Sequence, residues 1–133
     1  MILFIDTSKP ETKIALYKKS LLLAQKTWLS AKNQSEELLF EIDKLLKQNR
    51  VKKSDLKKIL VVNGPGSYTG LRVGLSTANM LAYSLQIEII GIDLDLKANK
   101  LTKILEANEG VFQKPIMPIY RYQPKITKPK SRR

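Results

Sequence analysis

The chain has 133 residues, with 24 Lys and Arg against 12 Asp and Glu, and it contains neither His nor Cys. This length suits one domain that buries about two-thirds of its unfolded surface. The composition excludes disulfides, thiol catalysis, zinc sites built on Cys or His, and imidazole acid–base chemistry. No apolar run approaches the roughly 20 residues of a membrane span and the N-terminus has no basic leader, so we expect a soluble cytoplasmic protein without membrane contact.

Three extended segments come first in the chain. Residues 3–7 form a short apolar run that ends beside an acid, and residues 13–18 and 21–29 are typical of two further strands. The connections between them are short enough for hairpin turns. We therefore predict an antiparallel meander of three strands.

An amphipathic helix follows the meander. Asn33, with Glu36 three residues later, matches an N-cap and capping box, and the helical spacing continues to about residue 48. Apolar residues recur along one face of this helix. They are Leu38, Leu39, Ile42, Leu45 and Leu46.

Strands and helices alternate in the rest of the chain. Residues 58–63 predict a short buried strand, residues 71–85 a helix and residues 87–92 another strand. Asp95 can cap a last helix, which we expect to end near Gly110. The order βββαβαβα predicts an α/β fold with a mixed sheet.

A glycine-rich loop joins the strand at 58–63 to the helix behind it. Such a turn can hold an anion on backbone N–H groups, or it can simply allow a tight turn and close packing. The spacing does not fit a Walker A loop, because Gly64 and Gly70 are separated by five residues and no Lys follows. It does not fit a dinucleotide fingerprint either, because Thr69 occupies the position of the third glycine.

The turn after the first predicted strand is a second candidate site. Asp6, Thr7 and Ser8 place a carboxylate beside two hydroxyl groups. This set can hold a metal-bound phosphate, although Asp and Ser at strand ends also serve as ordinary turn formers.

A stripe of small residues runs along the helix behind the loop. Gly70, Gly74, Ala78 and Ala82 recur at every fourth position. Such a stripe lets another element approach closely. That element is either the sheet of the same chain or a helix of a partner protein.

Basic charge is concentrated near the C-terminus. Residues 114–133 contain seven basic side chains and no acidic one. We predict a lobe over residues 1–110 and an extended basic segment rich in Pro and Lys over residues 111–133. The segment can contact phosphates of a nucleic acid, or it can be a solvated tail.

The loop at residues 64–74 resembles the signature loop of the TsaB (YeaZ) family. Segments 5–8, 59–62 and 90–92 lie at intervals that match the same family. The resemblance covers about residues 1–108.

This resemblance implies an actin-like/Hsp70-like ATPase fold, related to ribonuclease H, and a role in tRNA modification. TsaB proteins are thought to act as non-catalytic scaffolds or activators. They pair with the catalytic subunit TsaD, are joined by the ATPase TsaE, and help to install threonylcarbamoyl on the adenosine next to the anticodon. On tRNA, the basic segment would offer weak phosphate contacts through Arg121, Lys125, Lys128, Lys130, Arg132 and Arg133.

The family pairing uses the helix after the third strand and the helix after the glycine-rich loop. It therefore implies an interface on two helices of this chain, and a homodimer through the same helices stays open. The implied interface residues are Leu38, Leu39, Ile42, Leu45, Leu46, Gly70, Arg72, Gly74, Ala78 and Ala82.

The chain departs from the family after the last predicted helix. Members carry a second, similar subdomain there, whereas residues 106–115 lead directly into residues 118–121, which resemble a motif near the family C-terminus. We therefore expect the second lobe to be absent. Because a nucleotide lies between two lobes in this superfold, we expect no cofactor, no metal and no catalysis by this chain alone.

The loop residues are then vestiges of a phosphate loop. They are Asp6, Thr7, Ser8, Gly64, Gly66, Ser67 and Thr69. Two other functions remain as alternatives: an ATP-binding phosphotransferase-like protein of the same superfold, and a small basic RNA-binding module.

Overall fold

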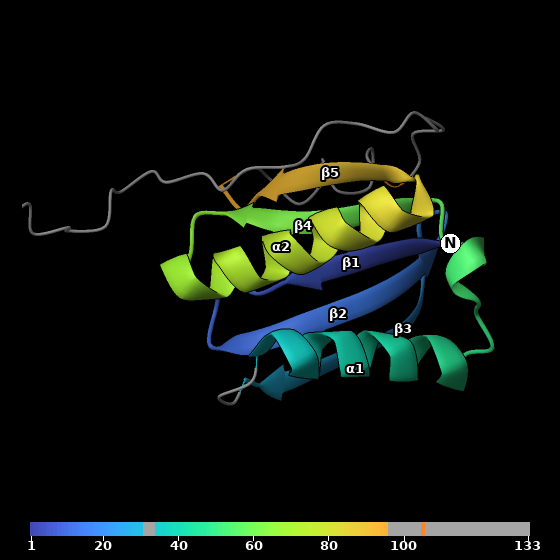
Figure 1. The fold of residues 1–133 in the computed structure, drawn as a ribbon, viewed down its shortest axis with the longest axis horizontal. Helices are drawn as coiled ribbons and strands as arrows, with labels where there is room; N and C mark the ends of the chain where they lie inside the picture. Colours follow the sequence, from blue (N-terminus) through green and yellow to red (C-terminus); the bar gives the residue numbers. More distant parts are fainter. Residues whose placement is uncertain (31–33, 96–104, 106–133) are drawn as a thin grey trace, which may run out of the picture.

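The computed structural model describes residues 1–30, 34–95 and Leu105. This part of the chain forms a five-stranded mixed sheet in the order β3-β2-β1-β4-β5, with two helices on one face (Figure 1). The strands are β1 (Ile2–Asp6), β2 (Glu11–Lys18), β3 (Leu21–Leu29), β4 (Lys58–Gly64) and β5 (Glu88–Asp93). The first three are antiparallel neighbours and β4 and β5 run parallel to β1, which confirms the predicted meander and mixed sheet.

The two helices cover neighbouring parts of the sheet. α1 (Gln34–Gln48) lies over β2 and β3, and α2 (Tyr68–Leu85) lies over β1 and β4 (Figure 1). A short 3₁₀ helix, η1 (Lys53–Asp55), precedes β4 and was not predicted. α2 begins three residues earlier than predicted because Ser67 acts as its N-cap and accepts a hydrogen bond from the Gly70 N–H.

Some predictions lie outside the described residues. They are the Asn33 cap, the last helix apart from Leu105, the domain boundary near residue 110, and the basic segment with its six candidate tRNA contacts. Among the described residues, no helix is long and apolar enough to cross a membrane.

Both faces of the sheet are apolar. On one face, alternate strand residues pack against α1 and α2; they include Leu3, Ile5, Ile14, Leu16, Ile59 and Val61. The opposite face carries a smaller cluster of Ile2, Phe4, Ala15, Leu60, Val62 and Leu105. The central strands therefore have little polar alternation, as expected where both faces are covered.

An ion pair is buried at the start of the parallel strands. Lys58 and Glu88 are register partners on β4 and β5, and their Nζ and Oε1 atoms lie 3.7 Å apart. Their side chains are 4% and 0% exposed. Removing one partner would leave the other charge in an environment where ionised groups are poorly solvated.

Candidate functional site

The turn after β1 is closed on itself. The Asp6 carboxylate accepts hydrogen bonds from the Ser8 N–H, at 2.9 Å, and from the Ser8 hydroxyl, at 2.6 Å. This is the Asx-type turn that Asp favours at strand ends. The same Asp6 oxygen, Oδ1, accepts both bonds, so the turn itself already uses it.

The glycine-rich loop packs directly on that turn. Because β1 and β4 are parallel neighbours, their carboxyl ends lie side by side, and the Ser67 N–H donates to the Ser8 carbonyl at 2.9 Å. A Cβ added to Gly66 would lie 2.5 Å from the Ser8 Cβ, which is closer than real contacts allow. The structure thus brings the two candidate segments together, with their backbones in direct contact.

Thr7 makes the same close approach to α2. A Cβ at Gly70 would meet the Thr7 carbonyl oxygen, and a Cβ at Gly74 would meet the Thr7 hydroxyl oxygen. The Thr7 hydroxyl also donates a hydrogen bond to the Gly70 carbonyl. These two glycines therefore allow the first turns of α2 to rest on the end of β1.

Gly64 has a different reason to be glycine. Its φ is 141°, a backbone conformation that residues with a side chain rarely adopt. Its carbonyl accepts a hydrogen bond from the Leu94 N–H at 2.8 Å, which ties the loop to the end of β5.

A small cavity with a mixed polar and apolar lining lies beside the loop, between the N-terminal ends of the two helices. Its volume is about 70 Å³, and its polar lining comes from Thr7, Lys9, Thr12, Ser30, Gln34 and Ser67. Pockets that enclose a nucleotide-sized ligand are on the order of 300–1,000 Å³. The cavity therefore has room for water but not for a nucleotide.

The predicted interface residues do not form one surface. Seven of the ten are buried within the chain: Leu38, Ile42, Leu45, Leu46, Gly74, Ala78 and Ala82. The interpretation that the small-residue stripe faces a partner is thus corrected, because these residues pack α2 onto β1 and β4. Gly70 is half-buried against Thr7, and only Leu39 and Arg72 are exposed.

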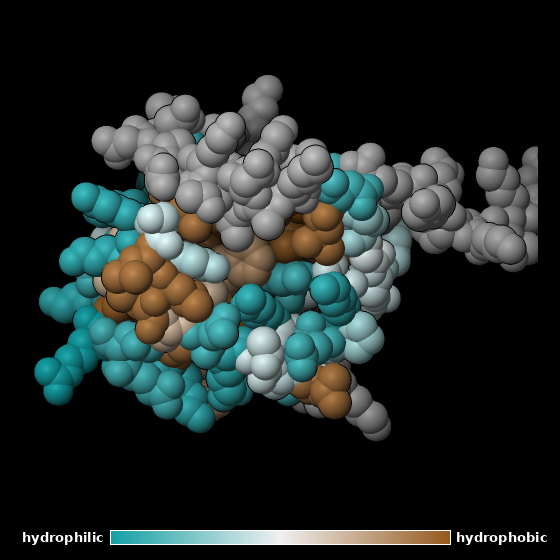
Figure 2. Space-filling view, turned by 180° about the vertical axis from the view of Figure 1, so that it is seen from behind, coloured by the Kyte–Doolittle hydropathy of each residue, from teal (hydrophilic) through white to brown (hydrophobic). Residues whose placement is uncertain are grey.

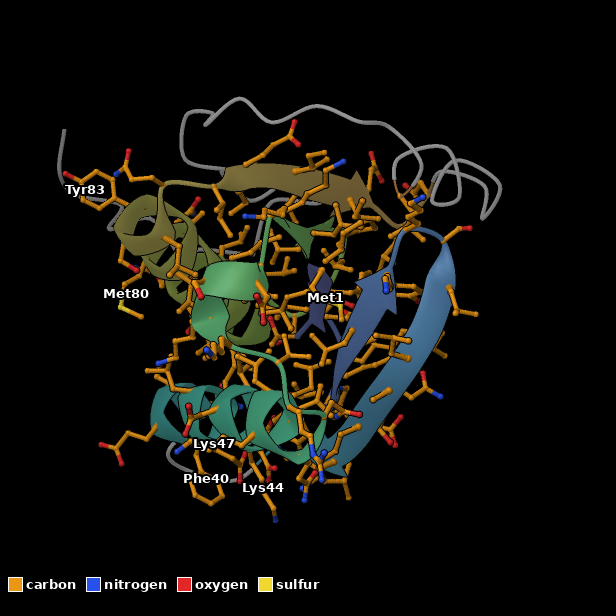
Figure 3. All side chains as sticks on the ribbon, turned by 90° about the vertical axis from the view of Figure 1, so that its right-hand side faces the viewer. Met1, Phe40, Lys44, Lys47, Met80 and Tyr83 are labelled. Carbon is orange, nitrogen blue, oxygen red and sulfur yellow. The ribbon has the colours of Figure 1, made fainter. Side chains whose placement is uncertain are left out.

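The outer side of the helix pair presents other apolar side chains, which were missed in the sequence. Phe40 of α1 is 63% exposed, and Met80 and Tyr83 of α2 are 50% and 69% exposed. Figure 3 shows Met80 and Tyr83 projecting away from the sheet, and Phe40 projecting from α1 near Lys44. The sequence feature that indicates such exposed residues is a large apolar side chain at a helix position outside the buried apolar stripe. We call Leu39, Phe40, Met80 and Tyr83 the outer helix face.

Side-chain contacts fix α1 against β3. Lys26 Nζ lies 2.6 Å from Glu41 Oε1, and the Trp28 indole N–H donates to Glu37 at 2.9 Å. These contacts join polar groups of the helix to the edge strand. They fix the orientation of α1, which carries Leu39 and Phe40, relative to the sheet.

This architecture defines a class of protein. Three antiparallel strands followed by two parallel strands, with both described helices on one face, form a single lobe of the actin-like, ribonuclease H-like fold. The family model that matches residues 28–120 is TsaD, described as tRNA N6-adenosine threonylcarbamoyltransferase. Within this family the chain belongs to the TsaB/YeaZ group, as the individual relatives indicate.

Three relatives illustrate this similarity. TsaB of Bacillus subtilis, a tRNA threonylcarbamoyladenosine biosynthesis protein, is 36% identical over 119 residues, covering 90% of this chain and 49% of the relative. TsaB of Buchnera aphidicola subsp. Schizaphis graminum is 34% identical over 101 residues, covering 75% and 48%. The structure of YeaZ from Pseudomonas aeruginosa superimposes with a TM-score of 0.64 at 26% identity, covering 69% of this chain and 43% of that one. The chain thus spans about half the length of these relatives.

Proposed function

We propose that this chain is a subunit of the machinery that makes threonylcarbamoyladenosine in tRNA, and that it pairs with a TsaD-like catalytic subunit through the outer helix face. The names of its TsaB relatives, tRNA threonylcarbamoyladenosine biosynthesis proteins, support the pathway. A TsaE-like ATPase and tRNA are further proposed members of the assembly.

The observation that carries the proposed pairing is the exposure of large apolar side chains on both helices. Phe40 and Tyr83 are each more than 60% exposed. Aromatic and Met side chains of this kind are enriched where proteins dock. The contacts of α1 with β3 hold the helix that carries Phe40 in place before a partner arrives, which reduces the entropic cost of binding.

We propose that the subunit does not itself carry out the transfer. In the loop, backbone and side-chain groups of Asp6, Ser8 and Ser67 are engaged with one another. The neighbouring cavity, at about 70 Å³, is too small to surround a nucleotide. The role that fits this geometry is to hold or activate a catalytic partner.

Co-expression with a TsaD-like chain from the same genome tests the pairing. We expect the two chains to co-elute, and Phe40→Arg and Tyr83→Arg to abolish co-elution while leaving the circular dichroism spectrum unchanged. Leu29→Arg is the matched control, because Leu29 is 74% exposed on β3, away from the helices. Failure of the unmodified chains to co-elute, or complexes that persist in both arginine variants, would refute the pairing.

A reconstituted modification assay tests the role. We expect threonylcarbamoyladenosine to form only when both chains are present, and the same arginine variants to reduce it in parallel with co-elution. Modification by this chain in the absence of a TsaD-like protein would contradict a non-catalytic role.

A further inference from the structure

A second apolar surface lies at the start of the edge strand β3, away from the outer helix face. Leu21, Leu22 and Leu23 open β3 and are 64%, 43% and 39% exposed. Figure 2, seen from behind, shows hydrophobic residues in several places on the molecule, and hydrophilic side chains project beside the largest group. We call these three residues the leucine patch. Among the described strands, β3 is at the edge of the sheet, so its outer backbone groups are open to an added strand.

Lysines lie at the same end of the sheet as the leucine patch, and two of them, Lys18 and Lys19, lie beside it. Lys18 pairs in register with Leu21, Lys19 occupies the hairpin turn between them, and Lys57 directly precedes β4 at the same end of the sheet. All three lysines are exposed. No carboxylate among the described residues lies within ion-pair distance of any of them.

The position of Met1 shows how close these charges are. The Lys57 N–H donates a hydrogen bond to the Met1 carbonyl at 2.8 Å. The next residue, Ile2, pairs with Tyr17 near the end of β2. Burial lowers the pKa of the Met1 amine, and the positive charges of Lys57 and Lys18 lower it further, against an opposing effect of Asp55. Positive charge is therefore concentrated along this end of the sheet.

We propose that the leucine patch and its lysines form a docking site for an acidic, aliphatic segment of another protein, bound in extended form along the edge of β3. Backbone hydrogen bonds to an edge strand supply affinity, and alternate side chains supply specificity. Here the leucines select aliphatic side chains and the lysines select carboxylates. This site is separate from the outer helix face, so it adds to the proposed function and does not depend on it.

Charge argues against the two other occupants that the chain itself could provide. The C-terminal residues 114–133 carry seven basic side chains and no acid, so they would be repelled by the lysines. A second copy would bring the same lysines to the interface in a symmetric pair, in a chain whose net charge is +12. Like charges placed together across an interface disfavour association.

Peptide binding to the full chain tests the proposal. The probe is a capped peptide of alternating Leu and Glu, and the controls are peptides of alternating Leu with Lys and Ser with Glu. We expect the Leu-Glu peptide to shift backbone NMR signals of β3 and to bind at least tenfold more tightly than either control. Its affinity should fall as salt is raised, because the lysines are exposed to solvent.

Variants locate the site. Leu22→Ser and, separately, Lys18→Glu should each weaken the Leu-Glu peptide at least tenfold, while Leu29→Ser, at an exposed residue farther along β3, should leave it unchanged. Circular dichroism confirms that each variant is folded. Equal binding of the Leu-Lys or Ser-Glu peptide, shifts confined to α1 and α2, or no binding at about 1 mM peptide would overturn the proposal.

The absence of cysteine allows a direct check of what covers the patch in the free protein. Leu22→Cys should react with a thiol reagent as fast as Ser76→Cys, a thiol placed on the exposed surface of α2. Protection at every protein concentration would mean that the chain covers its own patch. Protection that grows with concentration would mean that a second copy does so, and either result would overturn the proposal.

Discussion

The contact between α2 and the end of β1 makes a quantitative prediction at Gly74. A Cβ at this position would lie 2.2 Å from the Thr7 hydroxyl oxygen and 3.1 Å from its methyl carbon. To accommodate Gly74→Ala, either the helix must move away from β1 or Thr7 must change rotamer and lose its hydrogen bond to Gly70.

The expected change in the free energy of unfolding is the sum of two destabilising effects and one stabilising effect. Overpacking of a close contact costs about 1–3 kcal/mol, and loss of the Thr7 hydrogen bond costs about 1 kcal/mol. Ala is favoured over Gly within a helix by about 1 kcal/mol. We therefore expect Gly74→Ala to lower the free energy of unfolding by about 1–3 kcal/mol.

A second substitution isolates the contact. Thr7→Ala removes the hydroxyl and methyl groups that obstruct the new Cβ, so the double variant should be at least as stable as Thr7→Ala alone. The double-mutant cycle should give a coupling energy of about 2 kcal/mol, measured by urea unfolding followed by circular dichroism. Ser76→Ala, at an exposed position of the same helix, should change stability by less than about 0.5 kcal/mol. Zero coupling, or a Gly74→Ala variant as stable as the parent, would refute the close packing of α2 on Thr7.

Three further predictions concern burial and charge. Glu88→Gln should cost about 3–5 kcal/mol in urea unfolding because it breaks a buried ion pair by removing one partner. The pair Lys58→Met with Glu88→Leu should be close to neutral or stabilising, and equal costs would show that the charges do not interact. Ala78→Arg should unfold the chain, as thermal melting would show, because Ala78 is 0% exposed; a folded variant would contradict the position of α2. The Met1 amine has a pKa below its usual 8.0, so the folded state binds this proton less readily than the unfolded state, and the stability contributed by this group rises with pH and is fully regained above 8.0. Lys57→Ala should move the pKa of the Met1 amine upward, as the pH profile of amine labelling would show; an unchanged profile would contradict the charge effect of Lys57.

The sequence predicted the sheet well because local signals and burial agree there. The strand at residues 21–29 was placed at its observed bounds, since turn residues precede this extended run. The helix after the loop was predicted to start late, because the N-cap role of Ser67 depends on a backbone turn that hydrophobic spacing does not show. η1 was missed because a single turn of 3₁₀ helix has no periodic pattern.

The candidate interface was predicted less well, for a physical reason. The spacing of Ala78 and Ala82 predicts close approach but not the identity of the element that approaches. Only the tertiary structure shows that β1 and β4 fill that place. Phe40 and Tyr83 lie outside the apolar stripes of their helices, so helical spacing gives no signal for them.

Packing and docking are therefore assigned to different residues of the same helix, and this separation can be tested. On α2, Gly74 and Ala78 face the sheet, whereas Met80 and Tyr83 face away from it. Substitutions at the first pair should change the free energy of unfolding and affect partner binding only in proportion to the unfolded fraction. Substitutions at the second pair should change partner binding with little effect on unfolding, because exposed side chains contribute little to the stability of the free chain. If substitutions at both pairs changed unfolding and binding together, α2 could not be divided into a packing side and a docking side. That result would contradict the proposal that the outer helix face is the interface.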